Sequence, residues 1–274
     1  MVNFSGSLES RFYAGYNGKR RRKSLDGESS DSIHFHHLGR SAMAMFRINV
    51  KKRARILTRA EFRRMLKVVS ITREAQRNQL LLCFSFACGL RVTELASITI
   101  RDIMHPSGRL KSELTLRGDI TKNARVRTVP MSSNTLLHHL ELYLQYRLDN
   151  RIGMLPAETV EFRGLSPDLP VIFSNRGAPF AFARKKRTLQ DGTEEEYPAC
   201  DALEQLFRNL YLSGGYKGAS SYSGRRSFAT SLIQQGAEIE DVSRLLGHAD
   251  VDFTLPYLEP SKEEIRRAFE IALD

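Results

Sequence analysis

The chain has 274 residues, of which 41% are hydrophobic and 27% charged, and a formal net charge of +11. This composition excludes a fibrous or wholly disordered protein and is typical of a soluble globular one. No stretch approaches the roughly 18 consecutive apolar residues of a membrane-spanning helix, and the N-terminus lacks a signal-peptide core, so we expect a cytoplasmic protein without a membrane partner. The three cysteines form no CxxC pair, which favours buried thiols in a reducing compartment.

The first 55 residues carry most of the excess positive charge. They contain 12 Lys/Arg against 4 Asp/Glu and show no sustained apolar period. We therefore expect a flexible basic arm over residues 1–55 and a folded domain over residues 56–274. A basic arm suggests a polyanionic partner, although a simply solvated tail fits the composition equally well. Three histidines at positions 34, 36 and 37 have no fourth ligand nearby, so no metal site is predicted.

Helices are predicted at the start of the folded part. Thr58 and Glu61 have the spacing of a capping box, which predicts that a helix begins there. A second helix from about Thr72 is apolar on every side over residues 80–86, as is typical of a helix at the centre of a core. Gly89 is expected to end it as a C-terminal cap.

Short alternating segments follow between residues 112 and 130. Turns near Gly118 and Asn123 separate them, so this region predicts a small antiparallel sheet. A helix is expected from Ser133 onward. Residues 171–173 fit one more short strand, and the charged stretch over residues 181–197 predicts an exposed insertion.

The last part of the chain again has helical periodicity. Helices are expected at about residues 201–212, 224–235 and 238–246, with glycines as stops, and a final helix from Ser261 carries an apolar stripe of Ile265, Phe269 and Leu273. The fold class is therefore mainly α with a small antiparallel β-sheet (α+β).

Four local patterns place charged residues beside these elements. Gly-Leu-Arg-Val-Thr-Glu-Leu spans residues 89–95, and Lys-Asn-Ala-Arg-Val-Arg-Thr-Val-Pro spans residues 122–130. Tyr-Ser-Gly-Arg-Arg begins at residue 222, and Leu-Gly-His ends at residue 248, nine positions before a tyrosine. Each pattern alone is weak. Their order and spacing together resemble the tyrosine recombinase (phage integrase) family over about residues 56–274.

The resemblance implies a set of site residues. The candidate catalytic residues are Arg91, Lys122, Tyr222, Arg225, His248 and Tyr257, with Glu94 as a supporting residue. In the family, the two arginines bind the scissile phosphate, the lysine protonates the leaving 5′ oxygen and the last tyrosine is the nucleophile. Arg226 is interpreted as structural.

These residue types suit phosphoryl transfer. Two arginines can hold the non-bridging oxygens of a phosphodiester and stabilise its developing charge, and they stay charged at any working pH. A tyrosine that attacks phosphorus stores the bond energy in a phosphotyrosine, so rejoining needs no cofactor, neither a nucleotide nor a metal ion.

The resemblance also implies the partners. We expect double-stranded DNA as the substrate, a monomer in solution, and a tetramer when assembled on DNA. The helix from Ser261 is expected either to be exchanged between subunits, as is common in the family, or to pack on its own domain. The candidate DNA-binding residues of the arm are Lys19, Arg20, Arg21, Arg22, Lys23, Lys51, Lys52 and Arg53.

Two features depart from the family pattern. Tyr222 stands where most members have histidine, although hairpin telomere resolvases also have tyrosine there; a phenol is a poor base but a good hydrogen-bond donor. Residues 1–55 are also too short and polar to form the helical core-binding domain that precedes the catalytic domain in many members.

Two other functions remain open. Residues 236–258 resemble a helix-turn-helix, which fits a non-catalytic DNA-binding regulator. A type IB topoisomerase shares the chemistry. The arginines, lysine and tyrosine together favour a strand-transfer enzyme over a pure binding protein.

Overall fold

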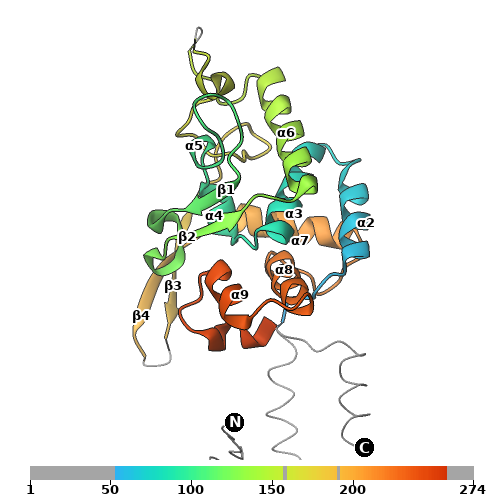
Figure 1. Ribbon diagram of the computed structural model, residues 1–274, viewed down its shortest axis with the longest axis vertical. Helices are drawn as coiled ribbons and strands as arrows, with labels where there is room; N and C mark the ends of the chain where they lie inside the picture. The colour runs from blue at the N-terminus through green and yellow to red at the C-terminus, as the bar shows by residue number, and fades with distance from the viewer. Residues whose placement is uncertain (1–52, 157–158, 190–191, 258–274) are drawn as a thin grey trace, which may run out of the picture. The chain divides into compact units, whose positions relative to one another are not determined.

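The computed structural model describes residues 53–156, 159–189 and 192–257. They belong to one compact unit, Arg53–Asp274. It is mainly helical, as predicted, and contains two small antiparallel sheets where the sequence predicted one (Figure 1). None of the described helices is long and apolar enough to cross a membrane. The α-helices are α2 (Arg59–Val69), α3 (Ala75–Ala87), α4 (Val92–Ser97), α5 (Ile100–Ile103), α6 (Asn134–Asp149), α7 (Asp201–Ser213), α8 (Tyr222–Gln234) and α9 (Ile239–Leu246).

Helix α3 is the central element of the core. Its residues from Leu80 to Ser85 are buried, and α6 and α8 pack against it. The predicted capping box of Thr58 and Glu61 is confirmed at the start of α2. Gly89 ends the α3 segment in the left-handed region at φ +60°, as predicted. The helix begins at Ala75 rather than near residue 72.

A close helix crossing places the start of α8. A Cβ atom added to Gly224 would lie 2.1 Å from the Ser85 hydroxyl oxygen of α3. Only a glycine allows the two backbones to approach this closely. The crossing therefore sets the position of Arg225, the next residue of α8.

The predicted small sheet is present as a two-stranded hairpin. Strands β1 (Glu113–Leu116) and β2 (Arg127–Pro130) pair antiparallel, with Leu114 opposite Val129. Alternate residues of each strand face the core. Two 3-10 turns, η1 (Gly118–Ile120) and η2 (Lys122–Ala124), connect the strands, and Asn123 within η2 has φ +60°.

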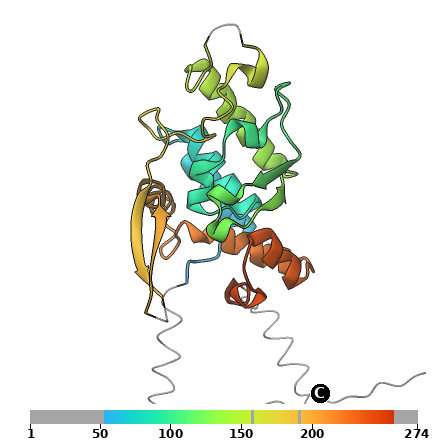
Figure 2. The ribbon, with the colours of Figure 1, turned by 90° about the vertical axis from the view of Figure 1, so that its left-hand side faces the viewer.

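The structure corrects one sequence interpretation and adds to another. Residues 171–173 form no strand: the segment is buried, and the Val171 N–H donates to the Ile98 carbonyl, but no ladder continues from it. The described part of residues 181–197 is largely exposed, as predicted, and the structure adds that two paired strands lie there, β3 (Ala183–Thr188) and β4 (Glu194–Ala199). Its charges obscure the strand pattern because ion pairs across the strands replace an apolar face. Figure 2 shows this hairpin along one side of the helical body.

The helices after residue 200 occur as predicted, within two residues at each end. Gly247 ends α9 in the left-handed region at φ +64°. Two further 3-10 turns, η4 (Val251–Phe253) and η5 (Leu255–Tyr257), lead to Tyr257, which packs beside a small cluster of α8 and α9 side chains. The predicted final helix lies outside the described residues.

Candidate active site

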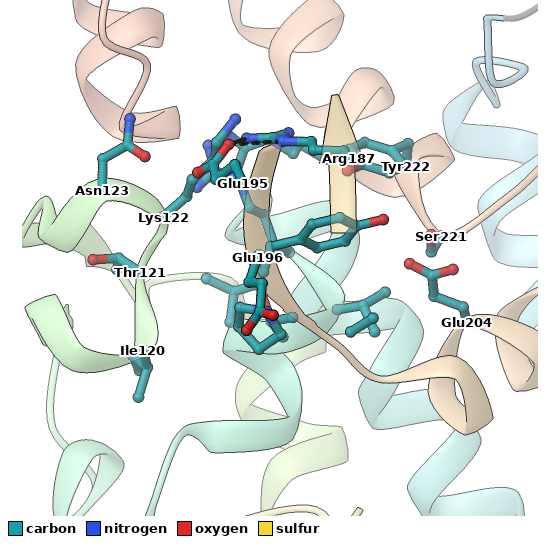
Figure 3. Close-up of a pocket in the computed structure, with 18 of the residues that line it drawn as sticks. Ile120, Thr121, Lys122, Asn123, Arg187, Glu195, Glu196, Glu204, Ser221 and Tyr222 are labelled. Carbon is teal, nitrogen blue, oxygen red and sulfur yellow. Dashed lines mark hydrogen bonds and ion pairs between the residues drawn. The ribbon is translucent and has the colours of Figure 1, made fainter. Parts of the chain in front are cut away.

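An open pocket of about 430 Å³ gathers residues from five parts of the chain. The junction of α3 and α4, the η1–η2 connection, the β3–β4 hairpin, Glu204 of α7 and the start of α8 line it. Four candidate catalytic residues are among the lining residues: Arg91, Lys122, Tyr222 and Arg225. Figure 3 shows Lys122 on one wall and the side chains of the hairpin on another.

Arg91 is held by the first turn of α4. Its backbone N–H donates to Glu94 Oε2 at 2.7 Å, and its guanidinium Nη1 donates to Glu94 Oε1 at 2.9 Å. Glu94 is fully buried. The carboxylate therefore orients the Arg91 guanidinium at the edge of the pocket.

Arg127 completes this arrangement, and the sequence interpretation missed it. Its Nη1 and Nη2 each donate to one oxygen of Glu94 at 2.7 Å, and its Nε donates to the Leu245 carbonyl at 2.9 Å. Burial raises the pKa of Glu94, but the hydrogen bonds and charge of Arg127, with the charge of Arg91, outweigh it and hold the pKa at about 2. A signal for Arg127 exists in the sequence: it shares the inward face of β2 with Val129. We call Arg91, Glu94 and Arg127 the buried interlock.

Arg225 is buried and makes three hydrogen bonds. It donates to the Gly89 carbonyl at 2.7 Å, to the Leu246 carbonyl at 2.5 Å and to His248 Nε2 at 3.1 Å. Burial, together with the charge of Arg91, lowers the pKa of Arg225 to about 10, so the side chain stays cationic at neutral pH.

The contacts of His248 define its protonation state. A guanidinium can only donate, so Nε2 accepts from Arg225 and Nδ1 carries the proton. Nδ1–H then donates to the hydroxyl of buried Thr254, with 2.7 Å between the heavy atoms. Burial and the neighbouring cations, Arg225 first, lower the pKa of His248 to about 3. The imidazole is therefore neutral.

Tyr257 lies beside this histidine. The two ring centroids are 5.3 Å apart. The Tyr257 carbonyl accepts from the Thr230 hydroxyl at 2.8 Å, and Arg226 donates to the Pro256 carbonyl at 3.3 Å. Helix α8 thus carries the buried guanidinium of Arg225 and also binds the backbone of the segment that ends at Tyr257. Arg226 makes a backbone contact in this arrangement, which fits its interpretation as a structural residue.

Tyr222 is the first residue of α8 and is 53% exposed at the pocket wall. The surrounding protein, and then the proximity of Tyr257, raise the pKa of Tyr222 despite the two nearby arginines. Its hydroxyl therefore keeps its proton and can donate a hydrogen bond, but it is unsuited to accept a proton.

Lys122 faces the same pocket from η2. Burial lowers its pKa, as do the charges of Arg187 and Arg91, while Glu195 opposes them. Arg187 and Glu195 belong to the β3–β4 hairpin, a region for which the sequence predicted only an exposed insertion. A polar, charged segment carries no local sign of the pocket against which it packs.

The cationic groups of the pocket suit an anion with several oxygens. Arg91 and Arg225 come from distant parts of the sequence, and Lys122 approaches from a third. Within residues 53–156, 159–189 and 192–257, no group of three or more metal-ligating side chains is found. Of the candidate arm residues, Arg53 is exposed, and the other seven lie outside the described residues.

This chain belongs to the Phage integrase family, whose model matches residues 55–264. It is 28% identical over 206 residues to the tyrosine recombinase XerA of Pyrococcus horikoshii, with 75% of this chain and 58% of that protein covered. It is 26% identical over 216 residues to the tyrosine recombinase XerD of Oceanobacillus iheyensis, with 78% and 61% covered.

Solved structures share the fold. The crystal structure of XerA recombinase superposes with a TM-score of 0.55 at 20% identity, covering 80% of this chain and 65% of that one. The XerH site-specific recombinase bound to its difH substrate gives 0.53 at 18% identity, covering 80% and 53%. The chain spans about three-fifths of the length of the curated relatives it matches.

Proposed function

We propose that this protein is a site-specific DNA recombinase or integrase that cuts and rejoins strands through a 3′-phosphotyrosine, with neither a metal ion nor ATP. One observation carries the proposal. Arg225 donates to His248, and the His248 ring lies 5.3 Å from the Tyr257 ring. A buried guanidinium, a neutral imidazole and a phenol ring thus lie next to one another. The guanidinium lines a pocket that Arg91 and Lys122 also line.

The strand cleavage step uses these groups as follows. The phenolic oxygen of Tyr257 forms a bond to phosphorus while the bond between phosphorus and the 5′ oxygen breaks. Lys122 gives its proton to that departing oxygen, the phenol loses its proton to water, and Lys122 regains one from water. The reverse sequence, with a 5′ hydroxyl from another strand, rejoins the DNA.

The remaining groups stabilise the phosphate. Arg91 and Arg225 bind the non-bridging oxygens as negative charge develops, and the fixed orientation of both guanidinium groups avoids reorganisation during the reaction. Tyr222 donates one further hydrogen bond in place of the histidine that most of the family has. Glu94 positions Arg91, and His248 positions Arg225 next to the nucleophile.

The partner in this proposal is double-stranded DNA. A monomer in solution assembles into a tetramer on DNA, and the helix from Ser261 docks on a neighbouring subunit. The basic arm, with its net charge of +8 over residues 1–55, contacts phosphates without reading sequence. Removing the arm should weaken binding to specific and random duplexes alike; unchanged binding would show that the arm is only solvated.

A nicked suicide substrate tests the nucleophile. Wild-type protein should form a DNA adduct that survives SDS, and Tyr257→Phe should abolish it because the attacking oxygen is gone. Tyr197→Phe is the matched control, since Tyr197 lines the pocket but has no assigned step. EDTA should leave the adduct unchanged. An adduct that persists in Tyr257→Phe contradicts the assignment, and a wild type that binds DNA without any adduct favours a regulator.

A further inference from the structure

The two strands of the β3–β4 hairpin carry opposite charges. Strand β3 presents four consecutive basic residues from Arg184 to Arg187, and β4 presents three consecutive acidic residues from Glu194 to Glu196. In the antiparallel register, Arg187 lies opposite Glu195. The hairpin is thus a ladder of ion pairs, and one of these pairs reaches the candidate active site.

The pair of Arg187 and Glu195 is more closely held than its neighbours. Arg187 Nε donates to Glu195 Oε2 at 2.8 Å, and Nη2 donates to the same oxygen. The guanidinium also lies over the Tyr197 ring, 5.4 Å from its centroid. By contrast, Lys186 approaches Glu194 only to 3.6 Å. Multiple contacts fix the orientation of Arg187 and Glu195, which a single long ion pair does not.

Both members of this pair line the pocket that contains Lys122. Figure 3 shows Arg187 and Glu195 joined on the hairpin, with Lys122 on the neighbouring wall. Their charges act on the lysine in opposite directions, since Arg187 lowers its pKa and Glu195 raises it. The other charged or titratable groups that share the pocket are Arg91, Asp119, Glu196, Tyr197, Glu204, Tyr222 and Arg225.

We propose that Arg187 and Glu195 are a positioning pair for Lys122, in which two offset charges keep the ammonium group protonated and available to the departing 5′ oxygen. This inference rests on the proposed function of Lys122. The physical reason is a balance. A lone arginine would favour loss of the proton from Lys122, whereas a lone glutamate would bind the ammonium group and repel the phosphodiester.

Titration of Lys122 in the full chain tests the pair directly. We would follow the ε-ammonium signal by NMR of lysine-labelled protein and assign it with Lys122→Arg. Glu195→Gln should lower the pKa of Lys122 and Arg187→Gln should raise it, each by about 0.2 to 0.7 pH units, the size expected for a partly exposed charge. The double variant should return close to the wild-type value.

The double variant separates this electrostatic action from a structural one. If the pair only stabilises the hairpin, losing both members should disturb Lys122 at least as much as losing one. Lys186→Gln and Glu194→Gln are matched controls, because this pair shares the hairpin but does not line the pocket. Glu195→Asp should keep the wild-type titration. Shifts of equal sign in the two single variants, or no shift in either, overturn the proposal.

Cleavage assays connect the titration to the reaction. Glu195→Gln should lose cleavage at a lower alkaline pH than wild type, and Arg187→Gln at a higher one. A substrate with sulfur in place of the bridging 5′ oxygen needs no acid, so it should remove these differences and rescue Lys122→Ala. Failure of that rescue shows that Lys122 is not the acid. Rescue of Lys122→Ala together with unshifted titrations overturns the positioning pair alone.

Discussion

Arg91 is held at the pocket by the buried interlock, and Lys122 shares the pocket with a hairpin that carries a ladder of ion pairs. The two sets of ion pairs differ in burial. The buried interlock places Arg127 and Glu94 at 5% and 0% side-chain exposure with two hydrogen bonds of 2.7 Å. The ladder of the β3–β4 hairpin places Lys186 and Glu194 at 64% and 63% exposure, 3.6 Å apart. Loss of one partner leaves an unpaired buried charge in the interlock but only a hydrated charge in the ladder. A buried ion pair therefore holds the geometry of the site, whereas an exposed pair such as Lys186 and Glu194 contributes little to it.

The largest effect is expected from breaking the interlock. Arg127→Ala should lower the free energy of unfolding by about 3–5 kcal/mol, because Glu94 remains buried without its main partner. Urea denaturation measures this change. Arg101→Ala is the control: its ion pair with Asp168 is exposed at 57% and 76%, so its loss should cost at most about 1 kcal/mol. Equal losses in both variants would contradict the expectation that burial makes the Arg127–Glu94 pair more important for stability than an exposed pair.

Tyr222, which lines the same pocket, should have an effect on cleavage. Tyr222→Phe removes one hydrogen bond to a developing charge, so cleavage should slow roughly ten- to a hundredfold, the range for a charge-assisted bond. Tyr222→His should retain activity and add a pH dependence near neutrality. Single-turnover rates on the nicked substrate measure both. A wild-type rate for Tyr222→Phe would mean that this phenol only packs.

Acid should lower the free energy of unfolding through His248 and through Glu94 of the interlock. The folded-state pKa of His248 is about 3, below its ordinary value of 6.5, so the unfolded chain binds the extra proton and stability falls as the pH drops from 6.5 towards 3. Glu94, at about 2 against 4.5, adds a further loss as the pH drops below 4.5. Unfolding followed from pH 8 to 4 should show the decline. His248→Gln should reduce the decline above pH 4.5, whereas exposed His138→Gln should not. Buried His139, whose pKa burial also lowers, contributes the remainder.

The smallest effect is expected from the ladder itself. Lys186→Ala should change the free energy of unfolding by less than about 0.5–1 kcal/mol, because both charges of its pair with Glu194 are already hydrated. High salt should reduce even this difference. A loss comparable with that of Arg127→Ala would show that the hairpin is an essential part of the core.

The sequence alone determined the features that depend on neighbouring residues. The capping box at Thr58, the glycine stops at Gly89 and Gly247, and the alternation of β1 and β2 are local patterns, and the structure confirms them. The family motifs, short signals of fixed spacing, also indicated Arg91, Lys122, Arg225, His248 and Tyr257 as one set. The structure places the first three at one pocket, His248 against Arg225, and the Tyr257 ring beside that of His248.

Tertiary structure decided what depends on contacts between distant segments. Arg127 joins Glu94, 33 positions away, and the Leu245 carbonyl, 118 positions away, so no local pattern could reveal that it holds the site together. The neutral state of His248 follows from the Arg225 guanidinium packed against it. Arg187 and Glu195 share a pocket with Lys122 because the β3–β4 hairpin packs near the η1–η2 connection. Electrostatic energies depend on burial and distance, and these are properties of the packed chain.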